Sequence, residues 1–314
     1  MECHVSSRNK KSETTPAFGN RTGIPPVPQN GAPVHYLSLI RDKYTSLGHR
    51  PYRWAVNQGT PPWKRLEKPI PRSTVALVAS GGIYMRGQVA FHYRDDTSYR
   101  VIPAGADPSD LRVTHFGYDV TDSRRDPAIV FPVAALRVMA DRGKIGSLSP
   151  ATYTCMGGIY SSRRVKEELA PALAERLTAD AVDAVMLVPA CPVCHQTMAL
   201  VARHLEEGGL PTLCLTSARD ITEAVNPPRA AFLDFPIGYI CGVPRDRAFQ
   251  EAIMAAALDA FDGITEPGSI ETLPFQWPGG TGWKAHAIDR RDVRMPRAAT
   301  PQYQQERDHC LNLS

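Results

Sequence analysis

Two cysteines separated by two residues, Cys191 and Cys194, are the side chains of this sequence that most clearly predict chemistry. After one thiol of such a pair has attacked a substrate, the other is close enough to form a disulfide with it. His195 follows directly, and its imidazole could tune a thiol pKa or transfer a proton. The group therefore predicts thiol-based redox chemistry.

The flanking sequence places this pair at a turn between a strand and a helix. Residues 184–188 are apolar and β-branched, as in a buried parallel strand, and apolar residues recur at helical spacing from Met198 to Leu205. Pro192 suits the first turn of a helix. Cys191 would then face the unpaired amides and the positive dipole end of the helix, a setting that lowers a thiol pKa.

Three other interpretations of the pair stay open. Zinc normally takes four ligands, so Cys155, Cys214 or Cys241 would have to converge on the pair from other loops. The Cys-x-x-Cys-His spacing is also that of covalent c-type haem attachment, although no secretory signal precedes it. The cysteines could also be small apolar residues that fill space at a turn. We expect no intrinsic cofactor or metal, with zinc and haem c as the alternatives.

Size and composition predict one large, globular α/β domain. The chain has 314 residues, of which 43% are hydrophobic, and its net charge of +4 forms no basic stripe that would indicate nucleic acid. No apolar run approaches the ~18 residues of a membrane helix. The seven cysteines are scattered and odd in number, unlike a secreted disulfide framework. We expect a cytoplasmic protein that binds neither membrane nor nucleic acid.

The chain divides into three regions. Residues 1–33 are rich in Pro, Gly, Ser and Asn, and we expect them to be disordered. Residues 34–262 alternate predicted strands and helices, which favours a doubly wound, mostly parallel, flavodoxin-like sheet. Within this domain, the Pro- and aromatic-rich arm at 51–63 should wrap a surface. Residues 263–314 are expected to form an irregular tail or a partner-binding arm.

Other candidate residues follow predicted strands, at the edge where ligands of parallel sheets gather. His115 follows a strand predicted at 111–114 and could transfer protons. Arg219 could hold a carboxylate or phosphate, within an S-x-x-D capping signature. The remaining candidates for substrate binding all lie at such strand ends and are Gly81, Gly82, Cys155, Ser217 and Asp234. No P-loop, dinucleotide fingerprint or GxSxG elbow is present.

Several short segments carry a family resemblance in their order along residues 34–262. They are residues 75–82, 110–119, 130–132, 145–148, 188–196, 217–222 and 234–238. In this order they resemble the glycine/sarcosine/betaine reductase selenoprotein B and D-proline reductase family. In its best-known members, a selenocysteine attacks the α-carbon of an amino acid, the C–N bond is cleaved reductively, and a nearby thiol recycles the selenium.

The resemblance implies matching roles here, with Cys191 at the selenocysteine position and Cys194 as the resolving thiol. A thiol with an ordinary pKa of about 8.5 is a poorer nucleophile than a selenol at neutral pH. The helix dipole or a charged His195 would need to compensate. The glycine, sarcosine and proline systems of this family also activate substrate through a pyruvoyl group on a separate subunit. Here either a partner would supply that group, or the substrate would already carry a good leaving group, such as a quaternary ammonium.

We therefore expect a dithiol-dependent reductase that cleaves a C–N or other carbon–heteroatom bond of a small amino-acid-like substrate. An external thiol or thioredoxin-type reductant would reset the disulfide. We also expect a homo-oligomer and a partner subunit, of pyruvoyl type or an electron donor. Two alternatives stay open, namely a substrate-specific non-catalytic subunit of a reductase complex and a zinc- or haem-binding redox protein that uses the same cysteines.

Overall fold

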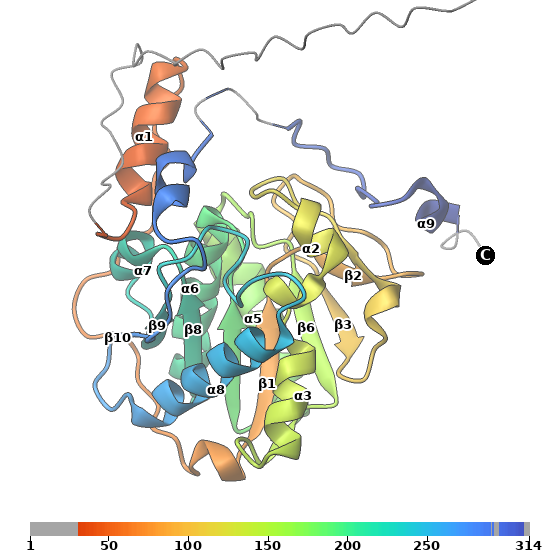
Figure 1. Cartoon of the computed structure of the whole chain (residues 1–314), viewed down its shortest axis with the longest axis vertical. Helices are drawn as coiled ribbons and strands as arrows, with labels where there is room; N and C mark the ends of the chain where they lie inside the picture. The colour runs from red at the N-terminus through yellow and green to blue at the C-terminus, as the bar shows by residue number, and fades with distance from the viewer. Residues whose placement is uncertain (1–30, 290, 292–294, 311–314) are drawn as a thin grey trace, which may run out of the picture.

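The protein is built around one central sheet with helices on both faces (Figure 1). The computed structural model describes residues 31–289, 291 and 295–310. Residues 1–33 are predicted to be disordered, and residues 1–30 of this segment lie outside the described residues. Among the described helices, none is both long and apolar enough to cross a membrane.

The strands of the central sheet run in the order β10-β9-β8-β7-β1-β6-β3, with the short β5 also beside β1. Their bounds are β1 (Thr74–Ala79), β3 (Tyr99–Pro103), β5 (Ser147–Leu148), β6 (Ala151–Cys155), β7 (Ala184–Val188), β8 (Thr212–Thr216), β9 (Arg229–Phe232) and β10 (Ser269–Thr272). Each pairing is parallel except β3 with β6. A separate antiparallel pair joins β2 (Ile83–Met85) to β4 (Leu111–Val113). The mostly parallel α/β sheet predicted from the sequence is confirmed.

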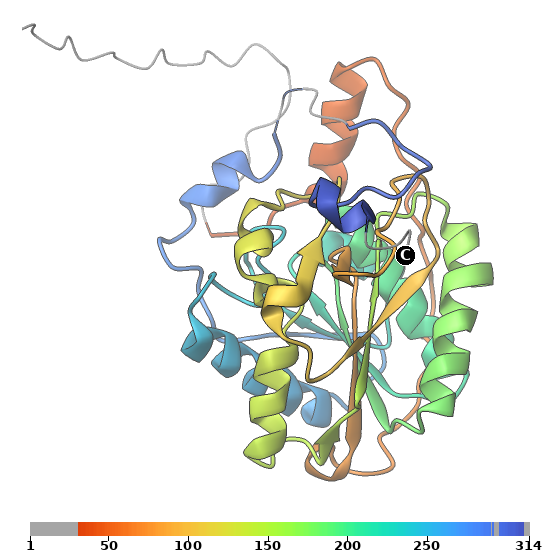
Figure 2. The same cartoon turned by 90° about the vertical axis from the view of Figure 1, so that its right-hand side faces the viewer.

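Two hydrophobic cores lie on opposite faces of the sheet. Figure 2 shows the helices that lie on either side of the sheet. One face carries α3 (Val133–Asp141) and α8 (Arg247–Gly263), and the other carries α5 (Ala170–Ala179), α6 (Pro192–Glu207) and α7 (Arg219–Val225). Side chains of β1 alternate between the cores, with Val75 and Leu77 in the first and Ala76 and Val78 in the second. This alternation explains why β1 is apolar throughout, since a parallel strand between two helical layers is buried on both sides.

The remaining elements are short except for α1. They are α1 (Tyr36–Ser46), α2 (Thr121–Arg125), α4 (Ser162–Arg164), α9 (Glu306–Cys310), the 3-10 turns η1 (Ile70–Arg72), η2 (Pro108–Asp110), η3 (Pro127–Ile129) and η5 (Gly282–His286), and the π-helical turn η4 (Val165–Leu169). The arm predicted at 51–63 has neither helix nor strand. It runs along α6 and α7, where the Ala55 amide donates to the Gln196 side chain and the Asn57 amide donates to the Ala224 carbonyl.

The described part of the C-terminal segment is more ordered than its composition indicated. Within the predicted irregular tail, β10 pairs in parallel with β9 and extends the sheet. The Lys284 ammonium, only 1% exposed, donates to the carboxylate of Asp234 and to the carbonyl of Ala32. The edge of β9 offers unpaired backbone groups, and Ile270 and Thr272 supply β-branched residues that pair with it well.

The order of strands reverses at β1. β6 lies on one side of β1, and β7, the next strand in the chain, lies on the other side. The loops that follow the neighbouring strands β1 and β7 therefore lead away from each other. Such switch points are where open α/β sheets bind ligands. Cys191 lies three residues beyond the end of β7, and Ser80 directly follows β1.

Candidate dithiol site

The two cysteines begin helix α6, as the sequence predicted. Cys191 is the N-cap residue, its sulfur accepts a hydrogen bond from the Cys194 amide at 3.1 Å, and Pro192 is the first helical residue. Proline at this position loses no hydrogen bond, because the first amides of a helix have no partner within it. The turn therefore aims a backbone donor at the Cys191 sulfur.

The Cys194 sulfur lies where loops from three other strands meet. It is 3.3 Å from Nε2 of His115 after β4, 3.3 Å from the Ser80 carbonyl oxygen after β1, and 3.8 Å from the Met156 carbonyl oxygen after β6. The two sulfurs and the His115 nitrogen all lie within 4.8 Å of one another. The sequence proposed His115 and both cysteines separately, and the fold brings them together.

Two glycines form the cover over the sulfurs. A Cβ atom at Gly117 would lie 3.0 Å from the Cys191 sulfur, and one at Gly157 would lie 2.9 Å from the Cys194 sulfur. Gly157 also has φ +66, a conformation that other residues rarely adopt. Cys155, two residues before Gly157, is among the site residues predicted from the sequence, but neither of these glycines is, and no local pattern distinguishes Gly117.

The environments of the two thiols differ. Burial raises the pKa of Cys191 well above its ordinary value, and the adjacent Cys194 raises it further. Burial also opposes ionisation of Cys194. The hydrogen bond with Cys191, the electrostatic attraction and hydrogen bond of His115 and a hydrogen bond with Ser80 outweigh it, and together they hold the pKa of Cys194 well below its ordinary value. The predicted lowering of the Cys191 pKa is therefore not found, because the thiol is buried beside a sulfur that ionises first.

Hydrogen bonds determine which nitrogen of His115 carries its proton. The Gly117 amide donates to Nδ1 at 2.8 Å, so Nδ1 must offer a lone pair. Nε2 then carries the hydrogen and faces the Met156 carbonyl oxygen at 2.7 Å as well as the Cys194 sulfur. A ring held this way is a hydrogen-bond donor at Nε2, and it offers no lone pair there to a zinc ion.

His195 is occupied by the backbone. Its Nδ1 lies 2.7 Å from the Cys191 carbonyl oxygen, and its Nε2 accepts a hydrogen bond from the Ser217 amide at 3.0 Å. Burial lowers the pKa of His195 to about 4, which keeps the ring neutral at pH 7. The imidazole thus ties the start of α6 to the loop after β8, and neither nitrogen is free to bind haem iron.

Two predicted binding residues are paired elsewhere. Arg219 lies on α7, where it bonds to Glu223 one turn later at 2.8 Å. Asp234 pairs with the ammonium of Lys284. The structure therefore does not bring either side chain to the sulfurs, and the Arg219 pair follows the ordinary i,i+4 spacing on a helix surface.

The other predicted binding residues lie near the ends of the strands, in the loops around the dithiol. Gly81 accepts a hydrogen bond from the Tyr118 hydroxyl at 3.0 Å, and Gly82 has φ +68 with Thr114 directly against it. Cys155 is fully buried, and burial raises its pKa. The Ser217 hydroxyl is buried without a hydrogen-bond partner among the described residues.

A row of aromatic rings leads from the thiols to the surface. Successive ring centroids are 5.5 Å apart from His115 to Phe116, 6.1 Å to Tyr160, 5.4 Å to Tyr52 and 4.8 Å to Trp54. Sequence reasoning singled out the arm that carries Tyr52 and Trp54 but missed Phe116 and Tyr160. Their contact depends on the packing of distant loops.

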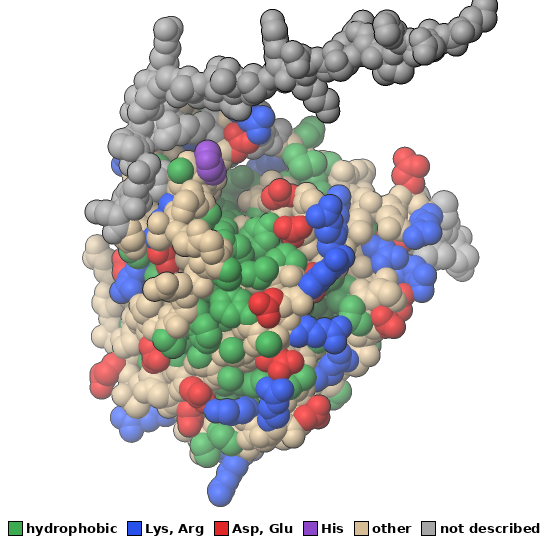
Figure 3. Space-filling view, in the orientation of Figure 1, with side chains coloured by type: hydrophobic (Ala, Val, Ile, Leu, Met, Phe, Trp, Pro, Cys, Tyr) green, Lys and Arg blue, Asp and Glu red, His purple; other side chains and the backbone are tan. Residues whose placement is uncertain are grey.

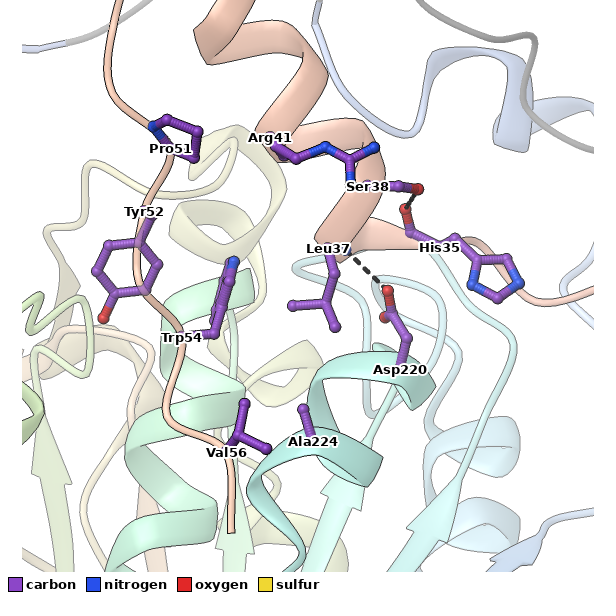
Figure 4. Close-up of a pocket in the computed structure, with 10 residues that line it drawn as sticks. All are labelled: His35, Leu37, Ser38, Arg41, Pro51, Tyr52, Trp54, Val56, Asp220 and Ala224. Atoms are coloured by element: carbon purple, nitrogen blue, oxygen red, sulfur yellow. Dashed lines mark hydrogen bonds between the residues drawn. The ribbon is translucent and has the colours of Figure 1, made fainter.

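A pocket of about 440 Å³ lies at the outer end of this row (Figure 4). It is lined by His35, Leu37, Ser38, Arg41, Pro51, Tyr52, Trp54, Val56, Asp220 and Ala224, from α1, the arm and α7. In Figure 4 the indole of Trp54 lies between Tyr52 and Leu37. Gln196 of α6 holds Tyr52 in place, because its side-chain amide donates to the Tyr52 hydroxyl at 2.7 Å.

Comparison with known proteins gives consistent matches. A sequence profile described as glycine/sarcosine/betaine reductase selenoprotein B matches residues 57–190, which ends one residue before Cys191. The chain is 34% identical over 220 residues to the D-proline reductase subunit gamma of Acetoanaerobium sticklandii, covering 69% of this chain and 91% of that protein. No solved structure matches significantly.

More distant similarity extends to larger proteins. The glycine reductase complex component B subunit gamma of Carboxydothermus hydrogenoformans is 30% identical over 213 residues, covering 65% of this chain and 48% of that subunit. The betaine reductase complex component B subunit beta of Peptoclostridium acidaminophilum is 23% identical over 183 residues, covering 54% of this chain and 41% of that protein. This chain therefore spans about half the length of these relatives.

Proposed function

This chain belongs to the glycine/sarcosine/betaine reductase selenoprotein B family, and on that premise we propose that it is a dithiol-dependent reductase of a small amino-acid-like molecule. One observation carries the proposal. The sulfurs of Cys191 and Cys194 lie together at the start of α6, beside a histidine donor and at the switch point of the sheet. Among the parallel strands, leaving β5 aside, the order is 2-1-3-4-5-6, which supports a flavodoxin-like assignment and a ligand site at this edge.

The reaction has two steps. The Cys191 sulfur attacks the substrate carbon, so that an S–C bond forms and the leaving group departs with the electron pair of its own bond. Cys194 then attacks the Cys191 sulfur, the carbon leaves with the S–C electron pair and takes up a proton, and a disulfide remains. The substrate gains two electrons and the dithiol loses two. An external thiol or a thioredoxin-type protein restores the dithiol.

The aromatic row supports a substrate with a cationic leaving group. Aromatic faces attract cations within about 6 Å of the ring centroid. The Arg297 guanidinium already lies 4.7 Å from the Tyr160 centroid, so this row accepts a cation in the present structure. A quaternary or protonated amine bound along Tyr52, Phe116 and Tyr160 would be placed beside the sulfurs.

Access to the dithiol requires a movement. Cys191 is 1% exposed and Cys194 is fully buried. Near Tyr52, the arm is held by Gln196 and by the Tyr160 carbonyl, which accepts a hydrogen bond from the Tyr52 hydroxyl at 3.0 Å. Farther along, Asn57 ties the arm to α7. The substrate would enter through the pocket outside the arm once the arm shifts.

The chain would work with other subunits. Its relatives are named as subunits of D-proline reductase and of glycine and betaine reductase complexes. We assign it a partner that supplies either an activated substrate or electrons, in the cytoplasm, where the five described cysteines, all free and buried, would stay reduced. The deep burial of both sulfurs also suits the second candidate function, a substrate-specific subunit whose catalysis depends on a partner.

Covalent trapping tests the proposal. Purified Cys194→Ser protein is incubated with glycine, sarcosine, betaine or D-proline, with and without cell extract that supplies partner subunits, and the mass of the peptide with Cys191 is measured. A substrate-derived mass on Cys191 is expected, and it should be absent in Cys191→Ser. Cys214→Ala, which removes a buried thiol outside the site, is the matched control. Reductive turnover that persists in Cys191→Ser would overturn the proposal.

A further inference from the structure

The surroundings of Cys194 provide for both of its protonation states. A thiolate needs a hydrogen-bond donor, and Nε2–H of His115 lies 3.3 Å from the sulfur. A thiol needs an acceptor, and the Ser80 carbonyl oxygen also lies at 3.3 Å. The Cys191 sulfur accepts a hydrogen bond from the Cys194 amide. This bond stabilises the negative charge when Cys191 becomes a thiolate. The two sulfurs are thus equipped for different tasks.

We propose that Cys194 shuttles one proton as well as resolving the adduct, and that His115 is the positioning residue that holds Cys194 ready as a thiolate. Two independent contacts determine that Nε2 of His115 is a hydrogen-bond donor. Nδ1 accepts from the Gly117 amide, and Nε2 lies against the carbonyl oxygen of Met156, which can only accept. The use of the shuttle in catalysis rests on the proposed function.

The proton balance closes over the two steps. The reduced pair holds one proton, on Cys191, and one negative charge, on Cys194. As Cys191 attacks the substrate, its S–H bond breaks and the proton passes to Cys194, whose S–H then donates to Ser80. When Cys194 attacks the Cys191 sulfur, it gives this proton to the departing carbon. One thiol and one thiolate thereby become a disulfide, and the substrate gains a hydrogen and loses its leaving group.

The other titratable groups around Cys194 stay neutral near pH 7. They are Cys191 and His195 from α6, Tyr118 from the loop after β4, and Cys155 at the end of β6. Burial raises the pKa of Tyr118 and of Cys155 and lowers that of His195. The charge on Cys194 therefore depends on Cys191, on His115 and on the hydrogen bond with Ser80.

Alkylation of Cys191 tests the shuttle without any substrate. Full-length protein is treated with iodoacetamide from pH 6 to 10, and the rate at Cys191 is measured by peptide mass mapping. If Cys194 takes the Cys191 proton, the rate in the unaltered protein should level off once Cys194 is ionised. In Cys194→Ala the rate should instead keep rising about tenfold per pH unit until Cys191 itself ionises, because no internal base remains. The same pH profile in both proteins would overturn the proposal.

The role of His115 is tested in the Cys191→Ser background, where the thiolate absorbance of Cys194 is titrated directly. His115→Leu removes the donor and should raise the Cys194 midpoint by at least about one pH unit. His115→Gln can place an N–H near the same position and should restore much of the shift. An unchanged midpoint in His115→Leu contradicts the role.

A measurement on the unaltered protein gives a test that does not depend on whether the variants fold. The ¹⁵N chemical shifts of His115 should identify the Nε2–H tautomer, and a proton on Nδ1 would also overturn the proposal. Both the titration and the tautomer are independent of turnover. Loss of the proposed reductase activity and failure of the proton shuttle are therefore separate results.

Discussion

The sulfur of Cys194 lies 3.3 Å from Nε2 of His115, although the two residues are 79 positions apart in the chain. The contact joins the helix after β7 to the loop after β4, across the end of β1. It places a fixed donor beside one thiol of the pair, while the other thiol faces a helix amide. The pair is therefore chemically unequal, as a reaction with separate attacking and resolving thiols requires.

The cover over Cys191 should not tolerate a side chain at Gly117. A Cβ there would lie 3.0 Å from both the Cys191 sulfur and Cε1 of His115. We expect Gly117→Ala to lower the rate of Cys191 alkylation and reductive turnover by tenfold or more, because a misplacement of about 1 Å at reacting atoms has effects of this size. Gly105→Ala is the control, since its Cβ would meet nothing within 4 Å. Unaltered rates in Gly117→Ala would show that this loop does not position the thiol.

The turn after β1 should depend on glycine for stability. Gly82 has φ +68, and its Cβ would lie 1.9 Å from the Thr114 carbonyl oxygen. Gly82→Ala should reduce the free energy of unfolding by about 3 kcal/mol or more, because both the backbone conformation and the clash are unfavourable. Gly263→Ala, with open space around its Cβ, should change it by less than about 0.5 kcal/mol. Urea denaturation measures both, and similar values for the two variants would contradict the account.

Local patterns in the sequence predicted the elements but not all their contacts. The apolar run at 184–188 located β7, and Pro192 marked the start of α6 accurately. The meeting of His115 with Cys194 depends on how β4 pairs with β2 at one end of the sheet, and no local pattern encodes that pairing.

One prediction was wrong and another stays a prediction. A binding role for Arg219 stays a prediction, although Glu223, one helical turn away, already pairs with its guanidinium. The strand β10 was missed because its four residues lie among prolines and glycines, and only the free edge of β9 gives them a partner. Such long-range pairing decides the outcome for short strands more than intrinsic preference does.

His195 should make the protein less stable in acid. Its pKa is about 4 in the folded state and about 6.5 in the unfolded chain, so the unfolded state binds more protons between these values. The contribution of neutral His195 to the free energy of unfolding is then fully present above about pH 6.5. It is lost as the pH falls toward 4, by about 3 kcal/mol in total. Urea denaturation between pH 4 and 7 measures the slope.

Replacement of His195 separates its contribution from that of other acid-sensitive groups. His195→Gln cannot titrate, so the slope between pH 4 and 6.5 should become shallower by about one proton. His204→Gln, on the same helix and partly exposed, is the control substitution. If His195→Gln keeps the full slope, the acid sensitivity has another source.

Release of the arm should expose the dithiol. The hydroxyl of Tyr52 is held between the Gln196 side chain and the Tyr160 carbonyl, and its ring lies in the aromatic row that leads to the thiols. Gln196→Ala removes the partner of both the Tyr52 hydroxyl and the Ala55 amide, which together contribute about 1–3 kcal/mol to the closed state. Alkylation of Cys191 should therefore accelerate by about 5- to 150-fold, the factor that corresponds to this free energy.

A second substitution distinguishes opening of the arm from loss of the aromatic surface. Tyr52→Phe keeps the ring but loses its two hydrogen bonds, so it should also accelerate alkylation while leaving binding of a cationic substrate nearly unchanged. Tyr52→Ala should accelerate alkylation but weaken that binding, because a cation–π contact is lost. Lys68→Ala, which breaks an exposed ion pair with Asp183 far from the site, is the control and should change neither. If alkylation is equally slow in all these variants, substrate reaches Cys191 by another path than the arm.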